Sequence, residues 1–351
     1  MELMERIAGI APADQAAYAA CQAQLNQIAK PLGSLGKLET LLCRVAAASG
    51  TAQIDVGKKC VLVFCADNGV VAQGVAQSGS EVTGAIARSL AAGTTSVSVM
   101  AQACGADVYP VDMGMLQPVP GVMDCRLGSG TGDISLGAAM SRQTAQQAVW
   151  TGMELVRKRV EEGYRVIATG EAGIGNTTTS SAVASVLLRQ PVERVTGRGS
   201  GLSDAGLVHK QQIIARALEV NRPDPQDPLD VLAKVGGFDL AAMTGAFLGG
   251  AAFHVPVVID GLISSVAALC AVRMCPAAGT YLLASHVSAE PAGKLLMEEL
   301  GLSAPLHADM RLGEGTGAVA LFPLLDLAAA VYHRAARFEQ IQVEAYTPWE
   351  N

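Results

Sequence analysis

Three acidic side chains stand where a parallel-sheet protein places reactive groups. Glu314 lies between two glycines just before a long apolar stretch, and Asp67 and Glu171 lie at the ends of strand-like segments. A carboxylate held in so tight a loop is not a helix-surface charge, and burial there would raise its pKa toward neutrality. We therefore predict that Glu314 acts as a general base. The alternative is a capping or loop acid at the start of a helix expected over 316–340.

Two glycine-containing loops could hold an anion. Residues 168–183, ATGEAGIGNTTTSSAV, combine a strand end, three glycines and a threonine-rich helix start. Glycine lets backbone N–H groups approach a ligand, and a helix N-terminus adds partial positive charge, so together they can cradle a phosphate. A tight turn before a capped helix is the alternative, since the Walker and dinucleotide signatures are both missing. The loop TGRGSGLSD at 196–204 adds Arg198 and, further on, Lys210 as possible anion partners.

The elements that must position these loops alternate along the chain. Each strand-like run is followed by a glycine- or serine-containing turn and a helical pattern; the runs are 60–67, 107–114, 165–171, 255–261 and 280–286. Such alternation predicts an α/β, Rossmann-like parallel sheet with helices on both faces. Ligands of such a sheet bind beyond the carboxyl ends of its strands.

The two ends of the chain differ from its middle. Residues 1–50 and 320–351 have apolar residues at helical spacing and no strand-like run. We predict a small helical domain built from both termini and packed against a large α/β domain over 51–319. The stretch 219–230, with three prolines and four acidic residues, is expected to be a loop between helices.

Composition narrows the possible partners and location. Half of the 351 residues are hydrophobic, the formal net charge is −7, and no run rich in lysine or arginine occurs, so we expect no nucleic-acid or membrane partner. The eight cysteines form no CxxC pair, which favours reduced thiols in a cytoplasmic protein without a metal site. The N-terminus has no secretory pattern. The histidines are expected to be structural; they are His209, His254, His286, His307 and His333.

One window could be mistaken for a membrane span. Residues 240–259 carry no formal charge and are long enough to cross a bilayer. Two adjacent glycines, His254 and Pro256 interrupt the window, so we expect a buried helix followed by a short strand.

Over nearly its whole length, the chain resembles a known family. This family is the nicotinate-nucleotide:dimethylbenzimidazole phosphoribosyltransferases of cobamide lower-ligand synthesis. Seven blocks occur in the family's order: KPLGSLGKLE (30–39), CADNGV (65–70), GEAGIGNTT (170–178), KVGGFDLAAMTGAFLGGA (234–251), DGLISSVAAL (260–269), SHVSAE (285–290) and MRLGEGTGA (310–318).

The resemblance implies a reaction and a set of site residues. It implies transfer of phosphoribose from nicotinate mononucleotide to an aromatic base, with inversion, release of nicotinate and no cofactor, by a dimeric enzyme. Glu314 matches the family's catalytic base, Glu171 a second active-site carboxylate, and Lys210 a residue near the nucleotide. The matching substrate-binding positions are Ser78, Ile86, Gly173, Ile174, Gly175, Asn176, Thr177, Thr178, Gly199, Ser200, Ser288 and Gly313.

Departures from the family pattern bear on the acceptor. Asn68 replaces a common histidine, residues 78–83 read SGSEVT where many members have S-P-x-x-V-T, and Ile86 replaces a glutamine that contacts benzimidazole. An aliphatic side chain cannot hydrogen-bond a second ring nitrogen, so phenol or p-cresol becomes a possible acceptor beside dimethylbenzimidazole. This looks like the branch whose members can pair with a paralogous chain. The other hypotheses are a silent partner subunit and a NAD-dependent dehydrogenase, and the latter lacks its glycine fingerprint.

Overall fold

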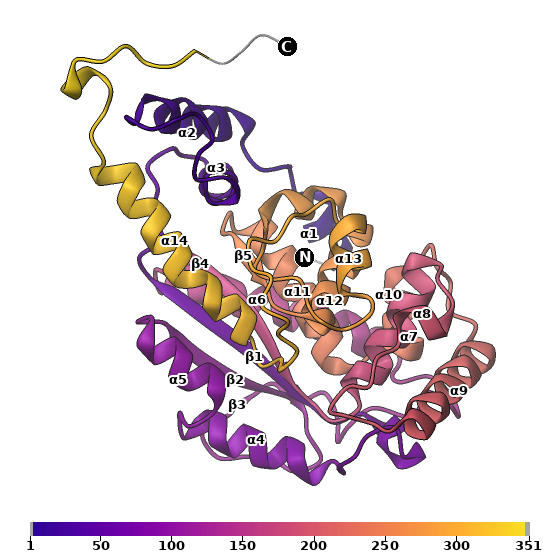
Figure 1. Cartoon of the computed structure of the whole chain (residues 1–351). Helices are drawn as coiled ribbons and strands as arrows, with labels where there is room; N and C mark the ends of the chain where they lie inside the picture. The colour runs from indigo at the N-terminus through magenta and orange to yellow at the C-terminus, as the bar shows by residue number, and fades with distance from the viewer. Residues whose placement is uncertain (1–2, 348–351) are drawn as a thin grey trace.

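The computed structural model describes residues 3–347, and a six-stranded parallel sheet runs through its centre (Figure 1). Its strands are β1 (Lys59–Ala66), β2 (Asp107–Gly114), β3 (Met123–Asp124), β4 (Val166–Ala172), β5 (Val257–Ile259) and β6 (Leu282–Ala284). The spatial order is β3-β2-β1-β4-β5-β6, which is the order of a Rossmann sheet. The order reverses between β1 and β4, where such folds bind their ligands.

Helices cover both faces of this sheet, as the alternating pattern predicts. In β1, Leu62 and Phe64 join the core on one face, while Val61 and Val63 join the core on the other. The first core includes residues of α1 (Leu3–Ala8), α6 (Arg142–Glu161), α7 (Asn176–Leu188), α8 (Val192–Val195), α9 (Asp204–Asn221), α10 (Pro228–Val235), α11 (Phe238–Ala252), α12 (Leu262–Met274) and α13 (Gly293–Glu299). The second includes residues of α2 (Gln15–Gln27), α3 (Lys37–Ser49), α4 (Glu81–Ala91), α5 (Ser96–Ala103) and α14 (Thr316–Arg334).

The five predicted strands are all present, with ends shifted by a few residues. Every residue of β1 and of β4 is buried, as expected for parallel strands covered on both faces. The sequence prediction missed β3, which has only two residues and therefore no readable pattern.

The chain ends pack on different sides of the molecule. Helix α2 packs on α3, and α3 packs on α14, within a core that continues onto the sheet through residues such as Leu42 and Phe322. Helix α1 packs instead against α11, with Leu3 and Ile7 in the core of the opposite face. Helix α14 ends at Arg334, earlier than expected, and residues 348–351 of the predicted small domain lie outside the described residues. The two-domain division stays a prediction.

The apolar window at 240–259 forms a buried helix and a strand, as predicted. Helix α11 is buried over nearly its whole length, and β5 follows it after a short turn. In the described range 3–347, α14 alone is long and apolar enough to cross a membrane by length and composition. More than half of that stretch, 56%, is buried inside the protein.

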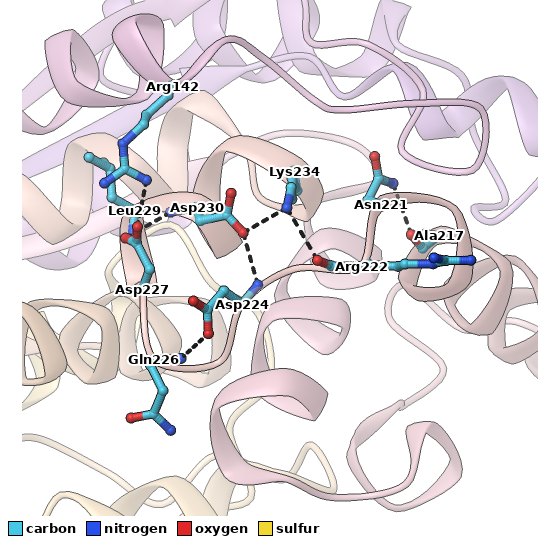
Figure 2. A network of polar contacts seen from close by, with 10 residues as sticks. All are labelled: Arg142, Ala217, Asn221, Arg222, Asp224, Gln226, Asp227, Leu229, Asp230 and Lys234. Atoms are coloured by element: carbon cyan, nitrogen blue, oxygen red, sulfur yellow. Dashed lines mark hydrogen bonds and ion pairs between the residues drawn. The ribbon is translucent and has the colours of Figure 1, made fainter.

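The predicted loop between α9 and α10 is held by a polar network (Figure 2). Arg142 donates to Asp227 at 2.7 Å, and the other oxygen of Asp227 accepts the first N–H groups of α10. Asp230 pairs with Lys234 at 2.9 Å and accepts the backbone N–H of Asp224. These acidic residues therefore serve the loop's own structure.

Candidate active site

One cavity lies beyond the carboxyl ends of β4, β5 and β6, where a ligand of this sheet is expected. Its volume is about 230 Å³, and it is walled by the loops that follow these strands, by the start of α7, by α4 and by the segment before α14. It brings together residues from four of the seven sequence blocks. The predicted site residues that line it are Ile86, Glu171, Gly173, Ile174, Gly175, Asn176, Thr177, Gly199, Ser200, Ser288, Gly313 and Glu314.

Three predicted site residues lie outside this lining. Lys210 is only 1% exposed and lies behind the wall, where its Nζ donates to Thr177 Oγ1 at 2.8 Å. Thr178 is fully buried in α7 and its hydroxyl has no hydrogen-bond partner among the described residues. Ser78 is half-buried in the loop before α4. Lys210 is therefore one side chain away from the cavity, whereas Ser78 is not brought into contact with it.

Glu314 lies in a loop whose backbone only glycine neighbours permit. Gly313, Glu314 and Gly315 all have positive φ angles, 92°, 62° and 95°. A non-glycine residue in this region is strained, and such strain is typical of functional sites. The loop rests directly on β4, because a Cβ atom added at Gly170 would collide with the Glu314 carbonyl oxygen. The glycines therefore let Glu314 lie between the carboxyl end of β4 and the cavity.

The carboxylate of Glu314 is partly desolvated and incompletely paired. Its Oε2 atom is buried and has no hydrogen-bond partner in the part of the chain that the structure describes. Burial raises the pKa of Glu314 above its ordinary value, while the backbone N–H of Val97 at the start of α5 opposes this. A partly desolvated carboxylate in the wall of a cavity is suited to take a proton from a ligand. Glu314 does not cap α14. The N-cap residue of this helix is Gly315, and no side-chain hydrogen bond caps its first turn.

Glu171 is the penultimate residue of β4 and faces the same loop. It is 8% exposed, and its Oε1 would lie 2.5 Å from a Cβ added at Gly313. Burial, together with the nearby carboxylates of Asp239 and Asp260, raises the pKa of Glu171 to about 8, although the amide of Asn176, which donates to Glu171 Oε2, opposes this shift. At neutral pH Glu171 therefore holds a proton, so Glu314 does not face a second full charge.

Asp260 anchors the segment that carries Glu314. Its two carboxylate oxygens accept the backbone N–H groups of Gly315, at 3.1 Å, and Ala318, at 3.0 Å, at the start of α14. Burial raises the pKa of Asp260 to about 6, with these N–H groups opposing. Asp260 was not among the residues predicted from the sequence, although it directly follows β5 and Glu171 lies near the end of β4, so position at a strand end would have identified both.

The glycine loop before α7 is fixed from both sides. Ile174 donates its N–H to Thr83 Oγ1 at 3.1 Å, and its carbonyl accepts from Asn68 Nδ2 at 3.3 Å. Gly175, with φ 88°, is the N-cap of the helix. Asn176 and Thr177, the first residues of α7, line the cavity, so the helix N-terminus faces it. This arrangement presents partial positive charge to an anion.

Charged side chains surround the far end of this loop. Burial lowers the pKa of Lys210 to about 8, and the nearby carboxylate of Glu290 opposes that shift. Burial raises the pKa of Glu290, opposed by Lys210 and Arg311, and one of its oxygens has no partner within residues 3–347. Arg198 lines the cavity but binds the Leu202 carbonyl oxygen at 2.9 Å. Glu290 and Arg311 also line the cavity, and the sequence analysis did not single them out.

Two further side chains depart from expectation. Asp67, grouped with the reactive acids in the sequence, is buried and accepts the backbone N–H of Leu116 at 2.7 Å, outside the cavity lining. His286, expected to be structural, is part of that lining. Spacing along the chain could not show this, because the residues around His286 come from β5, α14 and its own loop.

A Rossmann-ordered sheet whose cavity is lined by a helix N-terminus and a half-buried acid suits an enzyme that binds an anionic ligand. A family model described as phosphoribosyltransferase matches residues 10–343. The chain belongs to the nicotinate-nucleotide–dimethylbenzimidazole phosphoribosyltransferase family and is a pentosyltransferase. It is 45% identical to the enzyme of that name from Ruminiclostridium cellulolyticum over 331 residues, 94% of each chain. It is 43% identical to the one from Acetivibrio thermocellus, over 93% of this chain and 94% of that protein.

The fold is shared with a solved structure. The crystal structure of CobT from Thermus thermophilus superimposes with a TM-score of 0.88 at 38% identity, covering 94% of this chain and 99% of that chain. The predicted α/β class and family are thereby confirmed.

Proposed function

We propose that this enzyme transfers phosphoribose from nicotinate mononucleotide to an aromatic acceptor for cobamide synthesis, giving the α-ribotide and nicotinate. The observation that carries the proposal is the position of Glu314, a half-buried acid with a raised pKa that lines the same cavity as the α7 N-terminus. The names of the relatives, which specify a nicotinate nucleotide and dimethylbenzimidazole, support this substrate pair.

The phosphate is held at the α7 end of the cavity. Ser288, Gly199 and the N-terminus of α7 line that region, and Lys210 stands directly behind Thr177. With the phosphate fixed there, the ribose extends toward Glu314. Holding both reactants in line is the main contribution that positioning makes to such a displacement.

The chemical step needs one base and no acid. The C1′–N bond of the nucleotide breaks with its electron pair going to the pyridinium nitrogen, so nicotinate leaves without protonation. The acceptor nitrogen or oxygen forms the new bond to C1′ from the opposite side, which inverts the anomeric carbon. With a phenol, the attacking oxygen gives its proton to Glu314; with a benzimidazole, the unprotonated ring nitrogen attacks and the other ring nitrogen gives its proton to Glu314. The proton then passes from Glu314 to water. The carboxylate charge also favours the cationic character that develops at C1′.

Glu171 supports this step from the adjacent wall. Because its pKa is raised to about 8, it is a neutral hydrogen-bonding group at pH 7. Asp260 keeps the Glu314 segment in place through the N–H groups of Gly315 and Ala318. Of these three carboxylates, Glu314 is then the one that gains and loses a proton during turnover.

The acceptor wall is apolar, which supports phenol and p-cresol as acceptors beside dimethylbenzimidazole. Ile86, Met310 and Leu312 line the cavity together with Val75. These side chains cannot pair with a second ring nitrogen, so an acceptor with a single polar atom loses little by binding there. A phenol, whose pKa lies near the tyrosine value of about 10, depends on Glu314 for deprotonation.

The experiment is an activity assay with the purified protein. Nicotinate mononucleotide is offered with dimethylbenzimidazole and phenol in competition, and the ribotides are separated and quantified. We expect both products, and we expect Ile86→Gln to lower the phenol-to-benzimidazole ratio about tenfold, with Ile86→Val as the matched control. Synthesis of the benzimidazole ribotide without any phenolic ribotide, alone or with a paralogous subunit, would refute the phenolic part.

We also propose a dimeric, cytoplasmic enzyme, with either an identical or a paralogous partner. The exposed apolar side chains Val99 on α5 and Leu327 on α14, which lie on helices that pack together, support a protein partner. The eight free cysteines support a reducing compartment. Light scattering on the purified chain, with and without the paralogue, gives the assembly state.

A further inference from the structure

We propose that His286 binds a ribose hydroxyl of the phosphoribosyl donor through an unprotonated Nε2 atom. The proposal rests on the function proposed above and deepens it by assigning a contact to the sugar. His286 follows β6 in the chain, is 4% exposed, and lines the cavity.

The hydrogen bonds around the imidazole place its proton. The Ser285 hydroxyl donates to the Ile259 carbonyl oxygen at 2.6 Å, and Ser285 Oγ also lies 3.1 Å from His286 Nδ1. A hydroxyl has a single proton, which the short bond to Ile259 uses. The contact to His286 therefore runs from Nδ1–H to the serine oxygen, and in the neutral ring Nε2 carries no proton.

The surroundings of the ring favour this neutral form. Burial lowers the pKa of His286 below its ordinary value. The ring lies against Gly317 in the first turn of α14, where a helix carries partial positive charge that disfavours an imidazolium. The Asp260 carboxylate also lies beside Gly317, but its oxygens accept the backbone N–H groups of Gly315 and Ala318. That carboxylate is therefore already engaged.

The unprotonated Nε2 atom of His286 is accessible from the cavity. Nε2 makes no hydrogen bond to any residue in the described range, and it is absent from the fully buried, unpaired polar atoms. A methyl group placed on Gly261 would lie 3.7 Å from Nε2 and 3.8 Å from Ser288 Oγ. Nε2 and the Ser288 hydroxyl therefore both lie next to Gly261, which also lines the cavity.

The chemistry of the substrates decides what Nε2 can bind. An unprotonated nitrogen accepts a hydrogen bond, and a phosphate dianion has no proton to offer. The acceptor base gives its proton to Glu314, whose side chain reaches toward Val97 on the α5 side of the sheet. The remaining donors are the ribose hydroxyls, which adjoin a phosphate bound at Ser288.

Two variants separate the acceptor atom from the rest of the side chain. His286→Asn keeps an amide N–H near the Nδ1 position for Ser285 but has no atom at Nε2. His286→Gln extends an amide oxygen toward the Nε2 position. Each variant is assayed in the full-length enzyme for kcat/KM with nicotinate mononucleotide and with its 2′-deoxy and 3′-deoxy analogues, at saturating dimethylbenzimidazole.

The expected pattern is specific to one hydroxyl. The wild type should prefer the ribonucleotide about tenfold over the analogue that lacks the bonded hydroxyl, and His286→Asn should lose that preference while turning over this analogue like the wild type. His286→Gln should restore part of it. An equal loss on all three substrates, or an unchanged preference in His286→Asn, overturns the proposal. A wild type that does not turn over nicotinate mononucleotide refutes the proposed function instead, which is a distinct result.

Discussion

At the scale of single residues, the site depends on two glutamates, Glu171 and Glu314, whose surroundings favour different protonation states. Glu171 is enclosed with Asp239 and Asp260, and burial together with these neighbours raises its pKa to about 8. Glu314 is only half-buried, and burial raises its pKa while the backbone N–H of Val97 opposes this. The environment therefore assigns a stored proton to one acid and leaves the other to accept a proton, a division found where two titratable groups differ in surroundings.

The raised pKa of Glu171 predicts how its removal changes stability with pH. Between its ordinary value of 4.5 and about 8, the folded protein binds a proton that the unfolded chain releases, so this group's contribution falls as pH rises. The limit is about 1.4 kcal/mol per pH unit. Glu171→Gln keeps the neutral shape without this titration. Its free energy of unfolding should therefore rise relative to the wild type from pH 5 to pH 8.

Urea denaturation of both proteins at pH 5, 6.5 and 8 measures this difference. Asp239 and Asp260 are present in both proteins, so the difference reports Glu171 together with its coupling to these two carboxylates. A difference that stays constant over the range would show that Glu171 is ionised throughout and stores no proton at neutral pH.

The sequence identified some of these residues and missed others for a physical reason. Glu314 could be found because two glycines beside it imply a backbone that ordinary residues avoid. Glu290 and His286 could not be found, because their importance comes from neighbours distant in the chain, such as Lys210 and Gly317. The residues next to a position in the sequence indicate its backbone conformation, but they do not indicate which distant residues contact it in the fold.

At the scale of elements, the segment before α14 owes its position to a close approach between backbones. Gly170 in β4 lies under the Glu314 carbonyl, so Gly170→Ala must push the loop away from the strand. Because a backbone atom blocks the added methyl group, the structure cannot relax cheaply. We expect a loss of about 1–3 kcal/mol in stability and at least a tenfold fall in kcat/KM.

A matched control is Gly137→Ala, because a methyl group there meets no atom within 4 Å and the backbone conformation is an ordinary one. This variant should leave activity unchanged and stability within about 1 kcal/mol. If both variants behave alike in urea denaturation and in the assay, contact between β4 and the loop does not position Glu314.

Element types could be predicted from periodicity, but some ends could not. The strand β1 could be recognised from the continuous apolar residues 60–66, and β4 from its apolar start at Val166 and Ile167. The short β3 has no such run, and α14 ends at Arg334 although apolar residues continue beyond it. Strand pairing and helix termination at these places depend on tertiary packing.

At the scale of the whole molecule, the order of the strands creates the site. Alternating strands and helices predict a parallel sheet, but they leave open which strands are neighbours. In the observed order β1 lies beside β4, and β4, β5 and β6 are neighbours. The loops that follow β4, β5 and β6 and the segment before α14 therefore meet around one cavity beyond the carboxyl ends of the strands. Residues separated by more than a hundred positions thereby line one cavity.

The most direct test of the account is the turnover of Glu314→Gln, which keeps the shape of the side chain and removes its capacity to accept a proton. Rates are measured with nicotinate mononucleotide and either dimethylbenzimidazole or phenol, and binding of the nucleotide is measured by calorimetry. The account predicts a fall in kcat of at least about 100-fold with both acceptors, with nucleotide affinity changed by less than about threefold. A variant that retains more than about a tenth of wild-type turnover with either acceptor would contradict it.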